Sequence, residues 1–204
     1  MADKIILVGG GGHCKVVIDA IQKSGSFEIY GIADSSLPKD ETVLGIKVLG
    51  DDTILEELLK DGIKYAFISV GSIGNCGVRK KIYENLKDIG FELPVIIHPN
   101  AVKASDVETG EGTFVAAGAV INPGTKIGKN VIINTRSSVD HDCAIGDFVH
   151  IAPGAILSGG VKVGDEAHIG TGAKVIQSLE IGKRAFICAG ITITRNIDDE
   201  EKAK

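Results

Sequence analysis

The chain has 204 residues, of which 44% are hydrophobic and 24% are charged, and its formal net charge is −5. This composition is ordinary for a globular protein, and the length allows one large domain or two small ones. An acidic chain disfavours a nucleic-acid partner, because phosphate backbones are bound by clustered Lys and Arg. No apolar run approaches the roughly 18 residues of a membrane span, so we expect no membrane partner either.

The four cysteines, Cys14, Cys76, Cys143 and Cys188, are far apart in the sequence and form no CxxC pair. We therefore expect no metal centre built on cysteine. The first residues lack the long apolar region of a signal peptide. Together these features predict a cytoplasmic protein with reduced thiols.

Residues 1–95 alternate between strand and helix patterns. The apolar run Lys4–Val8 is typical of a buried parallel strand, and Gly9–Gly12 leads from it into a helical pattern over His13–Lys23. The next predicted elements are a strand over Phe27–Ile32, a helix over Thr53–Lys60, a strand over Tyr65–Val70 and an amphipathic helix over Val78–Ile89. This order predicts a Rossmann-like α/β domain over residues 1–95, with helices covering a parallel sheet.

Residues 96–204 follow a different period. Every sixth residue from Val115 to Ile193 is aliphatic, without exception. The series is Val115, Ile121, Ile127, Ile133, Val139, Ile145, Ile151, Leu157, Val163, Ile169, Val175, Ile181, Ile187 and Ile193. A period of six excludes an α-helix and is typical of hexapeptide repeats.

Glycine adds a second, longer period that equals three of these hexads. One column contains Gly128, Gly146, Gly164 and Gly182, and another contains Gly118, Gly154, Gly172 and Gly190 with Arg136 as its interruption. Three hexads per period predict a triangular coil whose corners use the conformational freedom of Gly. We therefore expect residues 96–204 to form a left-handed parallel β-helix.

His141 and Asp142 interrupt an otherwise plain part of the repeats. The period places Gly159 next to His141 on the following coil, which would leave open space beside the imidazole. A near-neutral pKa suits His for taking a proton from an amine or hydroxyl, and Asp142 could orient the ring. The alternative is a surface histidine at a coil corner.

His150 and His168 are separated by one full coil period and should stack on successive coils. They would either line a ligand groove or pack at a subunit interface, and spacing alone favours neither. A metal site is the weaker idea, because two imidazoles lack further ligands.

The run Gly9–Gly12 lies between a predicted strand and helix, where backbone amides favour a phosphate. Asp34 ends the second strand, as ribose-binding acids do in dinucleotide folds. The third glycine of G-x-G-x-x-G is missing, so a nicotinamide cofactor is not expected. A plain structural turn is the alternative to a binding loop.

Three stretches together resemble the sugar O-/N-acyltransferases of the sialic-acid O-acetyltransferase type and their relatives that N-acetylate nucleotide-linked 4-amino sugars. They are KIILVGGGGHCKVV at the start, VGSIGNCGVRKKIY in the middle and NTRSSVDHDCAIGDFVH in the repeats. The resemblance covers nearly the whole chain. It implies a homotrimer that binds acetyl-CoA in grooves between neighbouring β-helices.

The resemblance also implies roles for single residues. His141 would be the general base, and Asp142 would raise its basicity. His150, Gly159, Thr171 and Ala189 would contact acetyl-CoA. The sugar nucleotide would bind at six positions of the first domain: Gly11, Gly12, His13, Asp34, Ser35 and Gly71.

The expected activity is acetyl transfer from acetyl-CoA to the amino group of a nucleotide-linked 4-amino sugar. O-acetylation of a sialic-acid-type sugar is the alternative within the enzyme class. Outside it, the chain would be a β-helix scaffold or ligand-binding protein, although His141–Asp142 and the glycine run argue against that. A β-helix nucleotidyltransferase would need a longer catalytic domain than the predicted domain 1–95.

Overall fold

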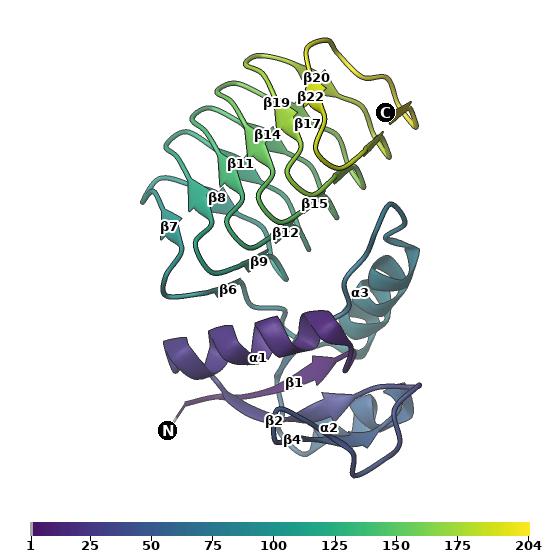
Figure 1. Cartoon of the computed structure of the whole chain (residues 1–204). Coiled ribbons are helices and arrows are strands. Elements are labelled where there is room, and N and C mark those ends of the chain that lie inside the picture. The colour runs from purple at the N-terminus through teal and green to yellow at the C-terminus, as the bar shows by residue number, and fades with distance from the viewer. Residues whose placement is uncertain (1) are drawn as a thin grey trace. The chain divides into compact units, whose positions relative to one another are not determined.

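The computed structural model describes residues 2–204, which fall into two compact units. The first unit comprises residues 2–72 and 77–98, and the second comprises residues 73–76 and 99–204. Figure 1 shows helices packed on a small sheet in the first unit and a stack of triangular coils in the second. The described residues contain no helix that is long and apolar enough to cross a membrane.

The first unit is a mostly parallel sheet in the order β3-β4-β2-β1-β5, with β3 antiparallel to β4. The sheet order reverses direction at β1, so the loop after β1 lies at the switch point where α/β folds bind ligands. The elements in chain order are β1 (Lys4–Val8), α1 (Gly12–Ser24), β2 (Glu28–Ala33), β3 (Thr42–Val43), β4 (Ile46–Gly50), α2 (Leu55–Lys60), β5 (Tyr65–Ile68), α3 (Gly77–Ile89) and β6 (Ile96–Ile97). A 3₁₀ turn over Asp52–Ile54 precedes α2.

Strand β1 is buried on both faces, as its continuous apolar sequence predicts. Ile6 and Val8 belong to an apolar cluster that includes Leu55 of α2 and Leu86 of α3. Ile5 and Leu7 alternate to the opposite face and are equally buried. The predicted Rossmann-like α/β fold is confirmed.

The hairpin of β3 and β4 was not expected from the sequence. Leu44 and Gly45 join its strands and both have positive φ values, +48° and +81°. These φ values are typical of a type I′ turn. Asn-Gly is a sequence signal for this turn, whereas Leu-Gly is not. The hairpin therefore left no recognisable sequence pattern.

The second unit is a left-handed parallel β-helix, as predicted. Two-residue strands from successive coils form its three faces. One face contains β7 (Val102–Lys103), β10 (Val120–Ile121), β13 (Ser138–Val139), β16 (Ile156–Leu157), β19 (Lys174–Val175) and β22 (Thr192–Ile193). The next contains β8 (Glu108–Thr109), β11 (Lys126–Ile127), β14 (Ala144–Ile145), β17 (Lys162–Val163) and β20 (Glu180–Ile181). The third contains β9 (Phe114–Val115), β12 (Ile132–Ile133), β15 (His150–Ile151), β18 (His168–Ile169), β21 (Phe186–Ile187) and β23 (Lys202–Ala203).

The two glycine columns serve different purposes. A Cβ on Gly164 would come within 2.7 Å of the Lys183 nitrogen, so that column allows two coils to approach closely. The other column lies at corners, where Gly154 and Gly172 have φ values of +68° and +66°. Arg136, its one non-glycine member, adopts the same left-handed conformation at φ +55°.

The aliphatic column forms the interior of the coils, and all its members are buried. Replacing Ile169, which is 0% exposed, with Ala should lower the free energy of unfolding by about 2–5 kcal/mol, because a cavity would remain between coils. Ile73→Ala is the control, since this side chain is 82% exposed and its loss should cost less than about 0.5 kcal/mol. Urea unfolding measures both, and equal losses would contradict the inward orientation of the column.

Candidate active site

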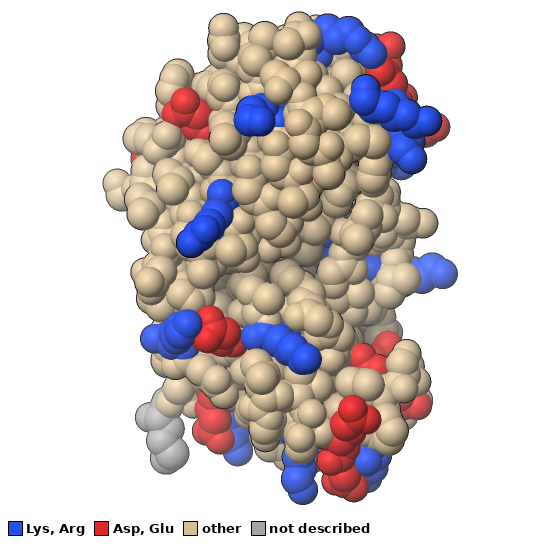
Figure 2. Space-filling model, in the orientation of Figure 1, with Lys and Arg blue, Asp and Glu red and all other residues tan. Residues whose placement is uncertain are grey.

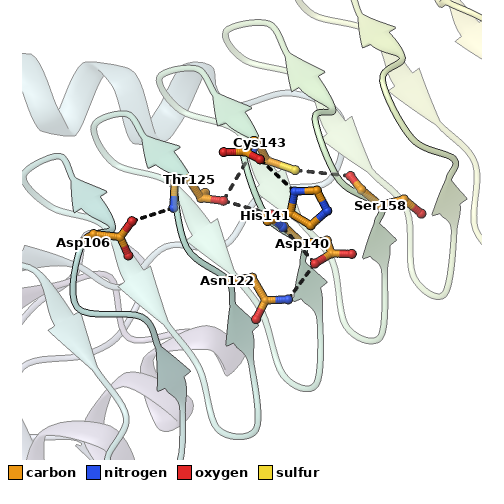
Figure 3. Close-up of polar contacts among 9 residues, drawn as sticks. Asp106, Asn122, Thr125, Asp140, His141, Cys143 and Ser158 are labelled. Carbon is orange, nitrogen blue, oxygen red and sulfur yellow. Dashed lines mark hydrogen bonds and ion pairs between the residues drawn. The ribbon is translucent and has the colours of Figure 1, made fainter.

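His141 lies at the corner that joins β13 to β14, and Figure 3 shows its ring standing away from the coil. Its Nδ1 is 2.8 Å from Oδ2 of Asp142, so the ring donates this proton to the carboxylate. The other nitrogen, Nε2, is then the basic atom. The hydrogen bond to Asp142 and the charge of Asp140 raise the pKa of His141 above its ordinary value.

Asp142 has a left-handed backbone with φ +59°. The same corner position is occupied by Gly124 and Gly160 on the neighbouring coils, both with positive φ. Gly is the residue that adopts this conformation most easily, so backbone preference alone does not explain an acid here. The carboxylate at this corner instead orients the imidazole.

Asp140 fixes the chain on the other side of His141. Its Oδ1 accepts hydrogen bonds from Asn122 Nδ2 at 2.7 Å and from the His141 backbone N–H at 2.9 Å (Figure 3). These donors lower the pKa of Asp140. Sequence analysis missed this pair, although Asn122 and Asp140 are one coil period apart and the repeat would have found them.

Gly159 provides the space beside the imidazole, as predicted. A Cβ at this position would be 2.5 Å from His141 Nε2. The resulting groove has a volume of about 530 Å³ and is lined by residues 140–142, 158–160, 177 and 178. None of these is Lys or Arg. The groove thus combines a basic nitrogen with two carboxylates and no cation.

Cys143 is not a nucleophile of this groove. Its side chain is 1% exposed, and its Sγ donates to the Ser158 carbonyl at 3.3 Å. Burial raises the pKa of the thiol, which disfavours the reactive thiolate. The thiol therefore faces the coil interior.

Thr171 and Ala189 lie one coil apart at a different corner from His141 and Gly159. Both are exposed. Of the four predicted acetyl-CoA residues, the structure therefore brings only Thr171 and Ala189 together, whereas Gly159 lies beside His141 and His150 lies in β15 on the third face. Their contact with acetyl-CoA stays a prediction.

His150 and His168 lie edge to face on the third face, with ring centroids 5.0 Å apart, and His168 stacks on Phe186. Both imidazoles are buried, at 8% and 6% exposure. His150 Nε2 lies 3.0 Å from Asn134 Nδ2, an amide donor, and burial lowers the pKa of His168. In a single chain the two rings therefore do not line an open groove, and the role of His150 stays a prediction.

The glycine loop of the first unit is held by Asp34. Partial burial opposes its charge, but N–H donors of Gly10, Ser36 and Leu37 outweigh that effect and lower the pKa of Asp34. The Gly10 N–H is 2.6 Å from Oδ2. The carboxylate thus positions the loop, whereas the neighbouring Ser35 is exposed.

Four of the other predicted nucleotide residues surround the start of α1. Gly11 is its N-cap, no side chain caps this end, and Gly11 and Gly12 line a pocket of about 370 Å³. Gly71 packs against His13, with 3.4 Å between a Cβ at Gly71 and the His13 Cβ. Burial and the Arg79 guanidinium lower the pKa of His13 to about 4, so His13 is neutral near pH 7.

Two further residues of this region were missed by sequence analysis. Arg79 of α3 is 2% exposed and donates to Ser72 Oγ at 3.0 Å. In the sequence it looks like a solvated charge on an amphipathic helix. Lys15 of α1 lines the same pocket as Gly11 and Gly12 and supplies a cation there.

Residues 2–204 contain no group of three or more His, Cys, Asp and Glu side chains that could hold a metal ion. On the face that Figure 2 shows, Lys and Arg lie singly or beside Asp and Glu rather than in one large basic patch.

Two family models match the chain. The PglD N-terminal domain matches residues 4–86, and the bacterial transferase hexapeptide (six repeats) matches residues 124–159. Among curated proteins, the GDP-perosamine N-acetyltransferase of Escherichia coli O157:H7 is 34% identical over 107 residues. That match covers 52% of this chain and 48% of the relative, so it spans about half of the relative's length.

Solved structures match over almost the whole chain. The H141N variant of perosamine N-acetyltransferase from Caulobacter crescentus, in complex with CoA and GDP-perosamine, has a TM-score of 0.92 and 38% identity. The match covers 98% of this chain and 92% of that one. The acetyltransferase domain of PglB from Neisseria gonorrhoeae FA1090, in complex with acetyl coenzyme A, has a TM-score of 0.88 and 36% identity, covering 98% and 94%.

The contact between His141 and Asp142 predicts a measurable titration. NMR of the imidazole should place the pKa of His141 above the ordinary value of about 6.5. Asp142→Asn should lower this pKa, because a charged acceptor is replaced by a neutral one. Asp147→Asn, which alters a carboxylate that accepts from the Lys129 backbone N–H instead, should leave the pKa of His141 unchanged. A pKa that does not respond to Asp142→Asn would contradict the assigned hydrogen bond.

Proposed function

The chain belongs to the sugar acyltransferases that join a PglD-type N-terminal domain to bacterial transferase hexapeptide repeats, and from this premise we propose that it N-acetylates a sugar nucleotide. The acetyl group comes from acetyl-CoA. The acceptor is the amino group of a nucleotide-linked 4-amino sugar. The observation that carries this proposal is the His141 imidazole, oriented by Asp142 and open at Nε2 into a groove beside Gly159.

The reaction proceeds by direct transfer. The acceptor nitrogen attacks the thioester carbonyl, the C–S bond breaks, and CoA leaves as the thiolate. His141 Nε2 takes the proton that the nitrogen loses, and backbone amides of a coil stabilise the oxyanion. No acyl-enzyme is needed, in keeping with the buried Cys143 thiol. A histidine was also the residue replaced in the H141N variant of the Caulobacter relative.

The first unit holds the nucleotide. The uncapped N-terminus of α1 and Lys15 favour phosphate oxygens at Gly11 and Gly12. Asp34 supports this site through its hydrogen bond to Gly10. The proposal thereby assigns nucleotide binding to the predicted domain 1–95 and acetyl transfer to the predicted domain 96–204.

The working form is a homotrimer. Within one chain, His141 and Gly159 lie at a different corner from Thr171 and Ala189. A groove between two copies would place both corner columns beside one acetyl-CoA molecule. The face that contains β7 and β16 supports such contacts, because Val102 and Ile156 on it are 63% and 42% exposed.

The reaction takes place in the cytoplasm in this proposal. All four cysteines are free thiols, as a reducing compartment would keep them.

A thiol-release assay with acetyl-CoA tests the acceptor. UDP- and GDP-linked 4-amino sugars should give turnover, and free sialic-type acids should not. Turnover only with the free acids would place the protein in the O-acetylating branch. If no acceptor gives turnover and the protein binds neither acetyl-CoA nor nucleotide, the result would favour a scaffold protein.

A further inference from the structure

The pocket beside the glycine loop carries opposite charges on its two walls. Gly10–Gly12 and Lys15 form one wall, and the segment that leads into the β3–β4 hairpin forms the other. Glu41 and Leu44 line this second wall. The pocket volume of about 370 Å³ lies within the range of roughly 300–1,000 Å³ found for small-molecule sites.

Glu41 has a fixed backbone and an unengaged side chain. Its carbonyl accepts from the Val48 N–H at 2.8 Å, and its N–H donates to the Pro38 carbonyl at 3.2 Å, which hold the residue against β4. Among residues 2–204 its carboxylate makes no hydrogen bond or ion pair. The adjacent acid, Asp40, is paired with Lys47 instead. An exposed and unpaired carboxylate on a fixed backbone is therefore available to a ligand.

A carboxylate in a phosphate-binding pocket is unfavourable unless the ligand presents N–H donors to it. Guanine presents two adjacent donors, N1–H and the 2-amino group, which match the two carboxylate oxygens. Uracil and thymine present one N–H between two carbonyl oxygens, which a carboxylate repels. Adenine presents its amino group beside a ring acceptor. The chemistry of Glu41 thus favours guanine over the other bases.

Leu44 provides the second observation. It is a bulky residue in the left-handed region, at φ +48°, and it is 56% exposed. Asn or Gly would occupy this turn position more easily. A strained and exposed leucine on the pocket wall gives an apolar surface for the face of a planar base.

We propose that the β3–β4 hairpin reads the nucleobase, with the Glu41 carboxylate accepting both N–H donors of guanine and Leu44 covering the ring. This inference rests on the proposed function, since it names the nucleotide of the same substrate. It assigns phosphate binding to the α1 wall of the pocket and base selection to the hairpin.

Calorimetric titration of the full chain with GDP, IDP, UDP and ADP tests the proposal. GDP should bind at least roughly tenfold more tightly than UDP or ADP. IDP, which lacks the 2-amino group, should lie between GDP and UDP. Glu41→Gln should weaken GDP roughly tenfold and leave UDP within about twofold. Glu57→Gln, an exposed acid of α2 outside the pocket, is the matched control.

Two further variants test the contributions of the two pocket walls separately. Lys15→Gln should weaken all four nucleotides by a similar factor. Leu44→Asn should weaken GDP and UDP alike, without lowering the free energy of unfolding, because Asn tolerates the left-handed turn.

Three results would contradict the proposed recognition of guanine but not the proposed function. They are binding of the four nucleotides without preference, a preference for UDP or ADP, and an unchanged GDP affinity in Glu41→Gln. A protein that binds none of the four nucleotides would overturn the proposed function together with it.

Discussion

Each coil of the β-helix hydrogen-bonds in register to the next coil along the chain, and the coils around His141 all have the same length of three hexads. This pairing is the constraint on which the candidate active site depends. It places Gly159 beside His141 and Asn122 beside Asp140. The absent side chain of Gly159 leaves space for the imidazole, and the Asn122 amide holds the neighbouring Asp140. A different coil length would separate all of these groups.

The same constraint explains which parts of the structure were predictable. The aliphatic residue at every sixth position predicts the interior of the coils directly. Of the two glycine columns, one predicts corners and the other predicts close approach of successive coils. The position of Gly159 beside His141 followed from the period alone. In the first unit, continuous apolar runs and an amphipathic pattern were enough to predict β1, β2, β5 and the helices, with small shifts at their ends.

The remaining features of the structure depend on contacts that a local sequence pattern does not indicate. The role of Asp34 in nucleotide binding stays a prediction, and no sequence pattern indicated that its carboxylate binds the backbone of the glycine loop. Arg79 looked solvated and is buried. The β3–β4 hairpin turns at Leu44–Gly45 without the residues that usually mark such a turn, and it contributes the second wall of the pocket beside the glycine loop. None of these features follows from a fixed period in the sequence.

The central claim is that His141 Nε2 is the base of the acetyl transfer. The most direct measurement compares kcat with the affinity for CoA in wild type and in His141→Ala. The account predicts that kcat falls by roughly 10²–10⁴-fold while the CoA affinity changes little, because the imidazole acts on the acceptor's proton rather than holding the donor. Wild-type turnover in the variant would contradict it.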